Sequence, residues 1–338
     1  MKSMQFDLKR QLPKIIFCLI IGVICALLAQ KRFYALILCF IGIYTIAVSG
    51  LDILYGYSGQ ISFGQAGFYA IGAYTSTLLS KNLGINPFFG TIIGAVFAVL
   101  VSMIVAVPAS QLKRHFLSVF TTVFGLLING LVGKLKFTGA ATGIMKIPKY
   151  SILGYELKSR QANLVLIVIV MLILLFLKNR IVNSRVGRAL VAIRENPAAA
   201  QGLGINVRSY KVMAFGISAA YASIAGSLYA HMVGFISPET FSGVTSTLFM
   251  TMLIFGGRTI LAGPLLGAAI ILPIREVFQS FVIYQGVVFA LFMIAALFFF
   301  PQGLMGLFKE TVDKIKAKKA GACMSEGEET AAELQNAE

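Results

Sequence analysis

The sequence is poor in charge. Only 12% of its 338 residues are Asp, Glu, Lys or Arg, which is about half the share in soluble domains. Hydrophobic residues instead make up 58% of the chain, and the mean hydropathy is +0.85. A soluble protein of this length would need an implausibly large core to bury that excess. The composition therefore predicts a membrane protein.

The sequence also lacks patterns that would indicate catalysis or ATP binding. The phosphate-binding pattern GxxxxGK[ST] does not occur, because the Gly133-Lys134 pair is followed by Leu135. The two histidines, His115 and His231, lie far apart with no acidic partner near them in sequence. We therefore expect a protein that is not an enzyme, and any ATP that drives it must be hydrolysed by another chain.

Cysteine and glycine patterns of cofactor sites are missing too. No CxxC or Cys/His pattern occurs, which argues against a metal site and against a disulfide framework. The pair Gly202-x-Gly204 does not extend to GxGxxG, since Val207 occupies the third position, so a dinucleotide loop is excluded. We expect no cofactor and no metal. The four cysteines are Cys18, Cys25, Cys39 and Cys323.

Apolar runs of membrane-spanning length follow one another along the chain. A helix needs about 20 residues to cross about 30 Å of hydrocarbon. The run 244–257 is too short for a simple span, which predicts a broken or re-entrant helix. The expected fold is all-α, a polytopic transmembrane helix bundle of about 8–10 spans with broken or re-entrant helices. The candidate runs are 12–30, 33–50, 60–80, 88–110, 116–133, 162–177, 211–231, 244–257, 262–280 and 285–300.

Basic residues predict the orientation. The net charge of +16 lies in short gaps between apolar runs, as topology signals do, and not in one stripe interleaved with aromatics, which excludes a nucleic-acid partner. With both termini cytoplasmic, the basic residues between Lys178 and Lys211 lie inside. Those of the segment 134–160 then lie outside, against the positive-inside rule, although longer translocated loops obey it less strictly. We expect a multi-pass protein of the bacterial inner membrane.

The chain divides into a membrane domain and a tail. Residues 1–308 form the expected transmembrane domain, which includes a long cytoplasmic connector at 178–210. Residues 309–338 begin with lysines and end in acidic, small-residue sequence, which predicts a cytoplasmic, disordered tail. Contact between the lysines and membrane lipid headgroups is the other interpretation of this tail.

Small and polar residues interrupt the third apolar run, where residues 56–74 read GYSGQISFGQAGFYAIGAY. Glycine permits close helix approach, and Ser or Gln can satisfy backbone groups freed by a helix break. A helix N-terminus at membrane depth would also present N–H groups to a substrate carboxylate. Helix packing and lining of a translocation pathway both remain open. The candidate pathway residues are Ser58, Gly59, Gln60, Ser62, Phe63, Gly64 and Gln65.

The cytoplasmic connector predicts two short helices. Leu190 and Ile193 have amphipathic spacing, the helical pattern breaks before Pro197, and Gly202 ends the second piece. A short polar helix in a cytoplasmic loop can dock a motor subunit, and a helix lying on the membrane surface is the alternative. Further along, a GxxxG pair predicts tight helix packing. The glycines assigned to packing are Gly256, Gly257, Gly263 and Gly267.

Together these stretches resemble the branched-chain amino acid ABC transporter permease family, specifically its M-type subunits of the leucine/isoleucine/valine system. The similar motifs are the one at 56–74, GRALVAIRENPAAAQGLGINVRSYK at 187–211, GGRTILAGPLLGA at 256–268 and PQGLMGL at 301–307. The resemblance runs from about residue 35 to 308. It implies an ABC importer permease that pairs with a second homologous permease, with two cytoplasmic ATPases and with an extracytoplasmic solute-binding protein.

The resemblance also assigns a coupling role to the connector. The ATPase-coupling residues it implies are Arg188, Ile193, Arg194, Glu195, Asn196, Pro197, Ala199 and Gly202. The chain departs from many relatives where Asp52 replaces Asn, Gln65 replaces His, Pro197 replaces an acidic residue and Thr259 replaces Gly. The departures at Asp52 and Gln65 leave the solute open, because similar permeases carry urea, amides or other small solutes.

Two other classes remain. An ion-coupled secondary transporter would need no ATPase, and an intramembrane enzyme or scaffold would need no transport. Against the former, membrane-buried acids that could relay protons are scarce between the first and last spans, and all of them are expected near the membrane interfaces. These acids are Asp52, Glu239 and Glu276. The sequence therefore favours a translocating permease for branched-chain or related amino acids.

Overall fold

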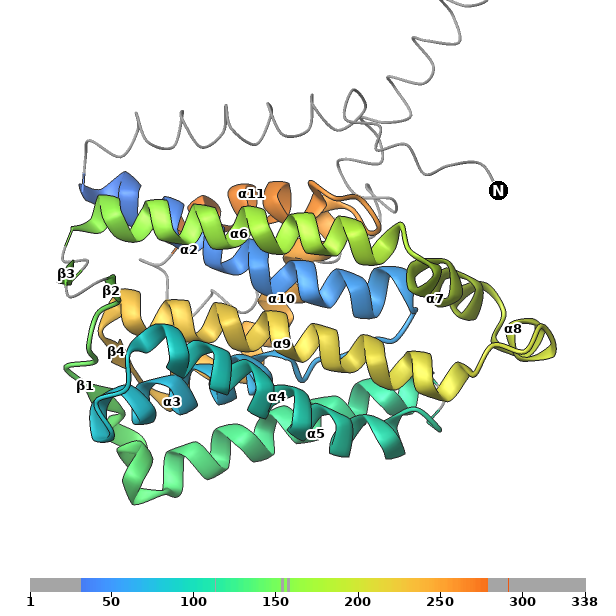
Figure 1. Ribbon diagram of the computed structural model, residues 1–338, viewed down its shortest axis with the longest axis horizontal. Helices are drawn as coiled ribbons and strands as arrows, with labels where there is room; N and C mark the ends of the chain where they lie inside the picture. Colours follow the sequence, from blue (N-terminus) through green and yellow to red (C-terminus); the bar gives the residue numbers. More distant parts are fainter. Residues whose placement is uncertain (1–31, 113, 153–154, 157–158, 279–290, 292–338) are drawn as a thin grey trace, which may run out of the picture.

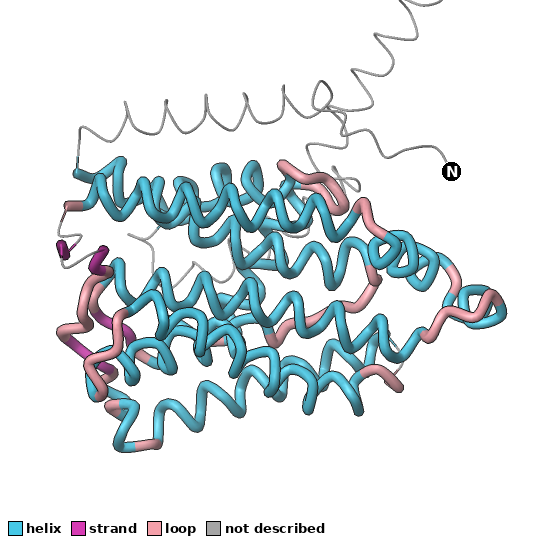
Figure 2. Tube along the Cα trace, in the orientation of Figure 1, coloured by secondary structure: helices cyan, strands magenta, loops and turns pink. Residues whose placement is uncertain are grey.

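The computed structural model describes residues 32–112, 114–152, 155–156, 159–278 and 291, and these residues are overwhelmingly helical (Figure 2). Within these described residues, two short antiparallel pairs of strands interrupt the helices, β1 with β4 and β2 with β3. The all-α prediction is confirmed. The helices are α2 (Arg32–Leu51), α3 (Gln65–Asn82), α4 (Pro87–Ala109), α5 (Arg114–Lys134), α6 (Arg160–Val182), α7 (Arg185–Glu195), α8 (Pro197–Gly202), α9 (Val207–Val233), α10 (Gly243–Gly256) and α11 (Gly263–Phe278).

Shorter elements join the helices. The π-helical turn η1 (Asp52–Tyr57) follows α2 without a break, and three 3-10 turns lie at η2 (Lys136–Thr138), η3 (Ala140–Thr142) and η4 (Pro238–Phe241). The strands are β1 (Ile144–Met145), β2 (Ser151–Ile152), β3 (Tyr155–Glu156) and β4 (Phe235–Ile236). The strands gather at one end of the bundle and α7 and α8 at the other (Figure 1). We call these the strand end and the α7 end.

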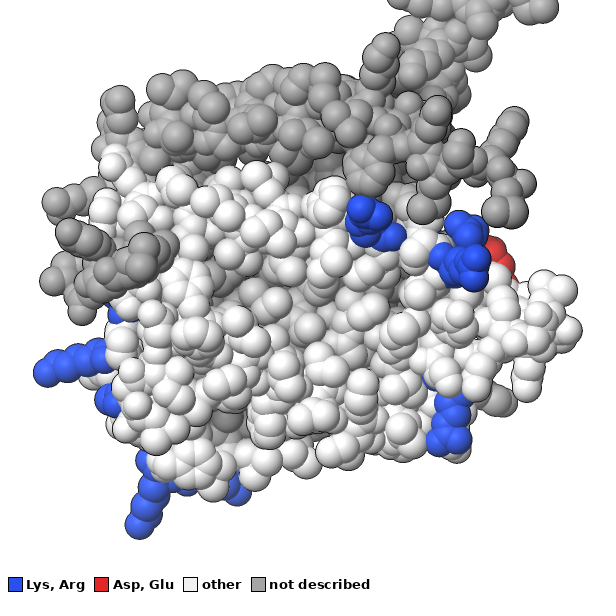
Figure 3. Space-filling model, in the orientation of Figure 1, with Lys and Arg blue, Asp and Glu red and all other residues white. Residues whose placement is uncertain are grey.

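Length and composition allow five of the described helices to cross a membrane. Helices α4, α5 and α6 bury less than a third of their most apolar window and so face outwards with apolar side chains, as lipid-exposed helices do. On the face drawn in Figure 3, Lys and Arg gather towards the two ends and leave an uncharged band between them. The five helical spans are Tyr34–Tyr57, Pro87–Ala109, His115–Lys134, Arg160–Val182 and Val207–Val233.

Two expected spans form shorter or irregular helices. Helix α10 has 14 residues, about 21 Å at 1.5 Å per residue, which is too short for about 30 Å of hydrocarbon. The span expected at 60–80 begins only at Gln65, because a loop after η1 returns from the α7 end before α3 starts (Figure 2). The runs 12–30 and 285–300 and the tail 309–338 lie outside the described residues. The total of 8–10 spans remains a prediction.

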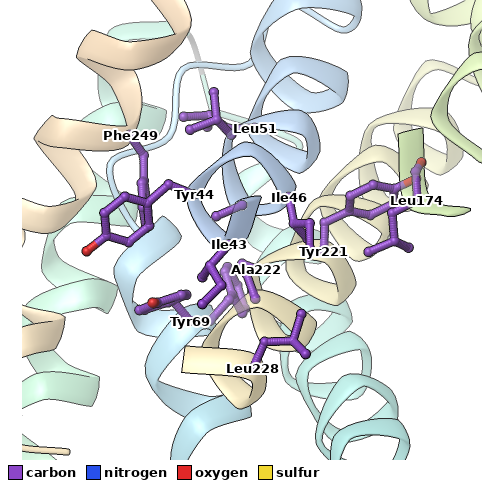
Figure 4. Close-up of a cluster of buried hydrophobic side chains, with 14 of the residues drawn as sticks. Ile43, Tyr44, Ile46, Leu51, Tyr69, Leu174, Tyr221, Ala222, Leu228 and Phe249 are labelled. Carbon is purple, nitrogen blue, oxygen red and sulfur yellow. The ribbon is translucent and has the colours of Figure 1, made fainter. Parts of the chain in front are cut away.

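Helix α9 holds the bundle together by packing against α2, α3 and α4. Figure 4 shows part of this core, with Ile46 of α2 near Tyr221 of α9 and Tyr44 of α2 near Tyr69 of α3. Small residues let α3 and α9 meet backbone to backbone. A Cβ on Gly72 would collide with the carbonyl of Ser223, so this close approach requires glycine.

Candidate coupling and translocation site

The connector forms the two helices that its sequence predicts. Ser184 begins α7 by accepting a hydrogen bond from the N–H of Val186 at 3.1 Å. Asn196 then begins α8, with its side-chain oxygen accepting from the N–H groups of Ala198 at 3.0 Å and Ala199 at 3.1 Å. Such a cap satisfies N–H groups that a helix start leaves free. Asn196, expected to touch an ATPase, is therefore also the residue that starts α8.

The two connector helices differ in exposure. Helix α7 packs onto the bundle through Leu190 and Ile193, each 1% exposed. Helix α8 projects beyond the bundle (Figure 1), and its residues Pro197, Ala199 and Gly202 are exposed. Leu203, directly after α8, is 80% exposed. The α7 end therefore presents a small apolar projection whose base is fixed to the bundle.

Arg194 fastens α7 to η1. Its Nη1 atom donates to the carbonyl of Gly56 at 2.6 Å, and its Nη2 atom pairs with Oε1 of Glu195 at 2.6 Å. The side-chain stem of Arg194 lies against Gly59, whose φ is +71°. A Cβ on Gly59 would lie 2.9 Å from Cγ of Arg194. Glycine at this position thus permits both the left-handed turn and the approach of Arg194.

A buried ion pair lies beside this contact. Nζ of Lys178 in α6 lies 2.7 Å from Oδ2 of Asp52 in η1, and both side chains are almost completely buried. Oδ1 of Asp52 accepts a hydrogen bond from the N–H of Thr259 at 2.9 Å. Tyr57 donates to the carbonyl of Thr259 at 2.6 Å. These contacts join α6, η1 and the loop between α10 and α11. We call Asp52, Tyr57, Lys178, Arg194 and Thr259 the η1 junction.

The sequence did not reveal this junction. It placed Lys178 at the start of the cytoplasmic connector, whereas the structure buries it in the last turns of α6. It placed Asp52 near a membrane interface, and the structure buries that side chain completely. The available signal was the departure from relatives at Asp52 and Thr259, two positions that prove to be bonded to each other. The π-helical form of η1 also indicates a functional role for the junction, since such turns are frequent at functional sites.

Two candidate pathway residues after η1 are buried and bonded within the protein. Ser58 donates to the carbonyl of Leu54 at 2.6 Å. Nε2 of Gln60 donates to Oγ of Ser58 at 2.8 Å and to the carbonyl of Lys211 at 3.2 Å. These side chains satisfy the irregular backbone after η1 and attach it to the start of α9. This arrangement supports the packing interpretation for Ser58 and Gln60.

The next candidate residues lead into α3. The N–H of Phe63 donates to Oγ1 of Thr121 at 3.1 Å, and a Cβ on Gly64 would lie 2.6 Å from the Thr121 carbonyl. Gln65 exchanges two 3.2 Å hydrogen bonds with Ser218, one with its carbonyl and one with its hydroxyl. Oγ of Ser62 accepts from the Gly64 N–H at 3.3 Å. A pathway role for these residues remains a prediction.

The start of α3 has little free donor capacity. The N–H of Ala66 donates to Oγ of Ser246 at 2.9 Å, and that of Gly67 donates to the carbonyl of Gly64 at 3.0 Å. A substrate carboxylate would have to displace these partners. The first turn of α3 is thus used to attach α10, through Ser246, to the segment that follows η1.

The packing glycines lie where α10 meets α11. A Cβ on Gly256 would collide with the carbonyl of Gly263, and one on Gly267 would collide with the carbonyl of Met252. Gly257 has φ +101°, a value that side chains disfavour. The two helices therefore approach more closely than any larger residue would allow. This places the loop that carries Thr259 against η1.

The histidine at the strand end has structural partners. One ring nitrogen of His231 lies 2.7 Å from Oγ of Ser76 and the other lies 2.6 Å from the carbonyl of Pro148. Tyr150 packs on the same ring at 4.9 Å between centroids, and burial raises the pKa of the Tyr150 hydroxyl. The described residues contain no group of three or more His, Cys, Asp or Glu side chains that could hold a metal ion.

Comparisons with known proteins agree with this architecture. The family described as branched-chain amino acid transport system / permease component matches residues 33–297. The chain is 31% identical over 304 residues to the high-affinity branched-chain amino acid transport system permease protein LivM of Escherichia coli (strain K12), covering 83% of this chain and 71% of that relative.

Permeases of the other type match more weakly. The chain is 25% identical over 293 residues to LivH of Escherichia coli (strain K12), covering 80% of this chain and 93% of the relative. It is also 25% identical over 279 residues to the probable branched-chain amino acid transport permease protein LivH of Methanocaldococcus jannaschii, covering 76% of this chain and 87% of that relative. No solved structure matches. The helical bundle, its membrane-spanning helices and these matches establish that the chain belongs to the branched-chain amino acid transport system permease family.

Proposed function

We propose that this chain is the membrane-spanning subunit of an ATP-driven importer, and that it translocates branched-chain or related amino acids. The observation that carries the proposal is the projection formed by α8 and Leu203, which is exposed while its base, α7, is bonded to the transmembrane helices through Arg194. An exposed apolar projection on a fixed base suits docking of a partner protein. The names of the relatives supply the solute class.

The partners follow from what the sequence lacks. It contains no phosphate-binding GxxxxGK[ST] loop, so two cytoplasmic ATPases bound at the α7 end would supply the energy. Relatives of both LivM and LivH type resemble the chain, which supports pairing with a second, homologous permease. A solute-binding protein would deliver the amino acid at the strand end.

The proposed orientation puts the α7 end in the cytoplasm together with both termini. Basic residues of the connector then face inwards, as the positive-inside rule requires. The chain between α5 and α6 would face outwards, where its strands and 3-10 turns shape the surface offered to the binding protein. ATPase movement would act on α8 and α7 and reach η1 through the Arg194–Gly56 hydrogen bond.

From η1, the movement would spread through the η1 junction. Asp52 holds η1 to Lys178 of α6 and to the backbone of Thr259, next to α11. A displacement of α7 would therefore move the α7 ends of α2, α6 and α10 together. Such shifts of packed helices relative to one another are a common form of transport-associated change. Asp52 and Lys178 act here as positioning residues and touch no substrate.

The proposal is tested at Leu203. Deleting all of 187–206 would also remove buried Leu190 and Ile193, so the loss of ATPase binding could then result from misfolding. Leu203→Glu places a charge only on the exposed projection. Its matched control is Leu83→Glu at the strand end, where the leucine is 67% exposed.

In the full assembly, Leu203→Glu should abolish co-purification of the ATPases and ATP-dependent leucine uptake into vesicles, whereas Leu83→Glu should keep the ATPases bound. Intact ATPase binding by Leu203→Glu would contradict docking at α8. Leucine uptake by the chain alone, driven by an ion gradient without ATP, would instead establish the secondary-transporter alternative. In a variant whose native cysteines are replaced, Leu203→Cys should resist a membrane-impermeant thiol reagent added outside sealed cells. Labelling of this cysteine would show that the α7 end faces outwards and would contradict the proposed orientation.

A further inference from the structure

Arg275 carries a charge about halfway through the bundle. It lies in α11, about 18 Å along the helix axis from Gly263, and its guanidinium lies close to the hydroxyl of Tyr44. Tyr44 is near the middle of the span Tyr34–Tyr57. A charged side chain at this depth is costly, and such residues usually face the interior of a bundle and mark a substrate or ion pathway.

The described surroundings of Arg275 contain tyrosines and no carboxylate partner. The two ion pairs between described residues join Lys178 to Asp52 and Arg194 to Glu195. Arg275 instead lies near three tyrosines, Tyr44, Tyr69 and Tyr229. Within the described part of the chain, the guanidinium is therefore not matched by an anion.

Aromatic rings surround this point. The ring centroid of Tyr69 lies 5.4 Å from that of Phe241, 5.5 Å from that of Phe249 and 6.5 Å from that of Tyr44. The rings come from α2, α3, η4 and α10, and Figure 4 shows Tyr44, Tyr69 and Phe249 around one point. Two distant stretches of the chain, α2 with α3 and η4 with α10, thus converge on an aromatic lining next to Arg275.

One polar atom in this lining is unexplained. The hydroxyl of Tyr69 is completely buried and has no hydrogen-bond partner among the described residues. A buried hydroxyl without a partner costs free energy, and such exceptions call for an explanation. The bonded hydroxyl of Tyr221 provides a contrast, since it donates to the carbonyl of Leu174 at 2.8 Å.

We propose that Arg275 and the Tyr69 hydroxyl bind the carboxylate of the amino acid during its passage, and that the rings of Tyr44, Phe241 and Phe249 receive its aliphatic side chain. A guanidinium presents a planar pair of donors that matches a carboxylate, and an apolar side chain passes favourably over aromatic rings. This site deepens the proposed function and rests on it. The plain alternative is that Arg275 only anchors α11 to α2.

Tyr69→Phe separates the two interpretations. It removes only the hydroxyl, so a purely structural Tyr69 would lose nothing. In the full assembly with its binding protein, we expect radiolabelled leucine uptake to fall about tenfold, the loss of one hydrogen bond to a charged group. The melting temperature of the purified assembly should stay the same or rise. Tyr221→Phe is the matched control, with a lower melting temperature and unchanged uptake.

Arg275→Lys provides a second variant that retains the charge and loses the paired donors. It should reduce leucine uptake beyond any loss of assembled complex. Wild-type uptake by Tyr69→Phe, or a melting temperature that falls for Arg275→Lys while uptake per assembled complex is unchanged, would overturn the site and leave the function intact. A wild-type assembly that takes up urea and no amino acid would overturn both the solute class and the site.

Discussion

Removing one charge from the buried Asp52–Lys178 pair should destabilise the protein far more than removing both. Nζ and Oδ2 lie 2.7 Å apart, with the two side chains 1% and 0% exposed. A lone charge left at this depth costs about 3–5 kcal/mol, whereas a well-packed neutral replacement of both partners is often neutral or stabilising. Asp52→Asn and Lys178→Met should therefore each lower the free energy of unfolding by about 3–5 kcal/mol.

The double variant should recover most of that loss. Asn at position 52 keeps a side-chain oxygen for the Thr259 N–H, and Met at position 178 fills nearly the volume of lysine without its charge. The double variant should therefore unfold with a free energy within about 2 kcal/mol of the wild type. The interaction free energy of the double-mutant cycle is then at least ~4 kcal/mol, the difference between the summed single losses and the loss in the double variant.

The assay is equilibrium unfolding in mixed micelles with increasing dodecyl sulfate, followed by far-ultraviolet circular dichroism. Glu195→Gln is the control, because it removes the partner of Arg194 from an exposed ion pair whose glutamate is 68% exposed. Exposed pairs contribute about 0–1 kcal/mol, so this variant should unfold nearly as the wild type does. Single effects of Asp52→Asn and Lys178→Met that simply add in the double variant would refute the reasoning.

The remaining predictions concern backbone geometry. Thr259 has φ +64°, a left-handed backbone conformation that strains a residue with a side chain. Thr259→Gly should therefore raise the free energy of unfolding by about 0.5–1 kcal/mol, and a lower free energy of unfolding would contradict backbone strain at this position. Gly59→Ala should displace Arg194 and expose the connector, seen as faster tryptic cleavage after Arg194, and unchanged cleavage would argue against that contact. Gly267→Ala should destabilise by about 1–3 kcal/mol through overpacking, measured in the same micelle assay. Gly130→Ala in α5, where a Cβ would meet nothing within 4 Å, should destabilise by no more than ~0.5 kcal/mol, and equal losses in both would exclude overpacking as the cause.

Local patterns predicted the elements whose causes are local. Connector residues near Pro197 and Gly202 indicated two short helices, and the structure has α7 and α8 there, because a proline start and a capping Asn196 depend on neighbours in sequence. The short run at 244–257 likewise indicated an irregular helix, and α10 has only 14 residues. Roles in coupling, in translocation and in helix packing remain predictions for the residues named from the sequence.

Other features depended on distant partners. The sequence could not show that Gln60 bonds to the backbone of Lys211, or that Ser58 would donate to the carbonyl of Leu54. It also gave no indication that Tyr69 would lack a partner for its hydroxyl. Each of these facts depends on which helices become neighbours, and apolar periodicity does not specify that.

Composition alone indicated a membrane protein, because no soluble core can bury so high a share of apolar residues. The sequence motifs indicated the family. Only the tertiary structure decided the fate of its few charges. Asp52 and Lys178 are far apart in sequence and meet at 2.7 Å because α2 and α6 pack together. A charge inside a bilayer is costly and either pairs with another group or faces the interior of the bundle, and helix packing in three dimensions decides which groups it meets.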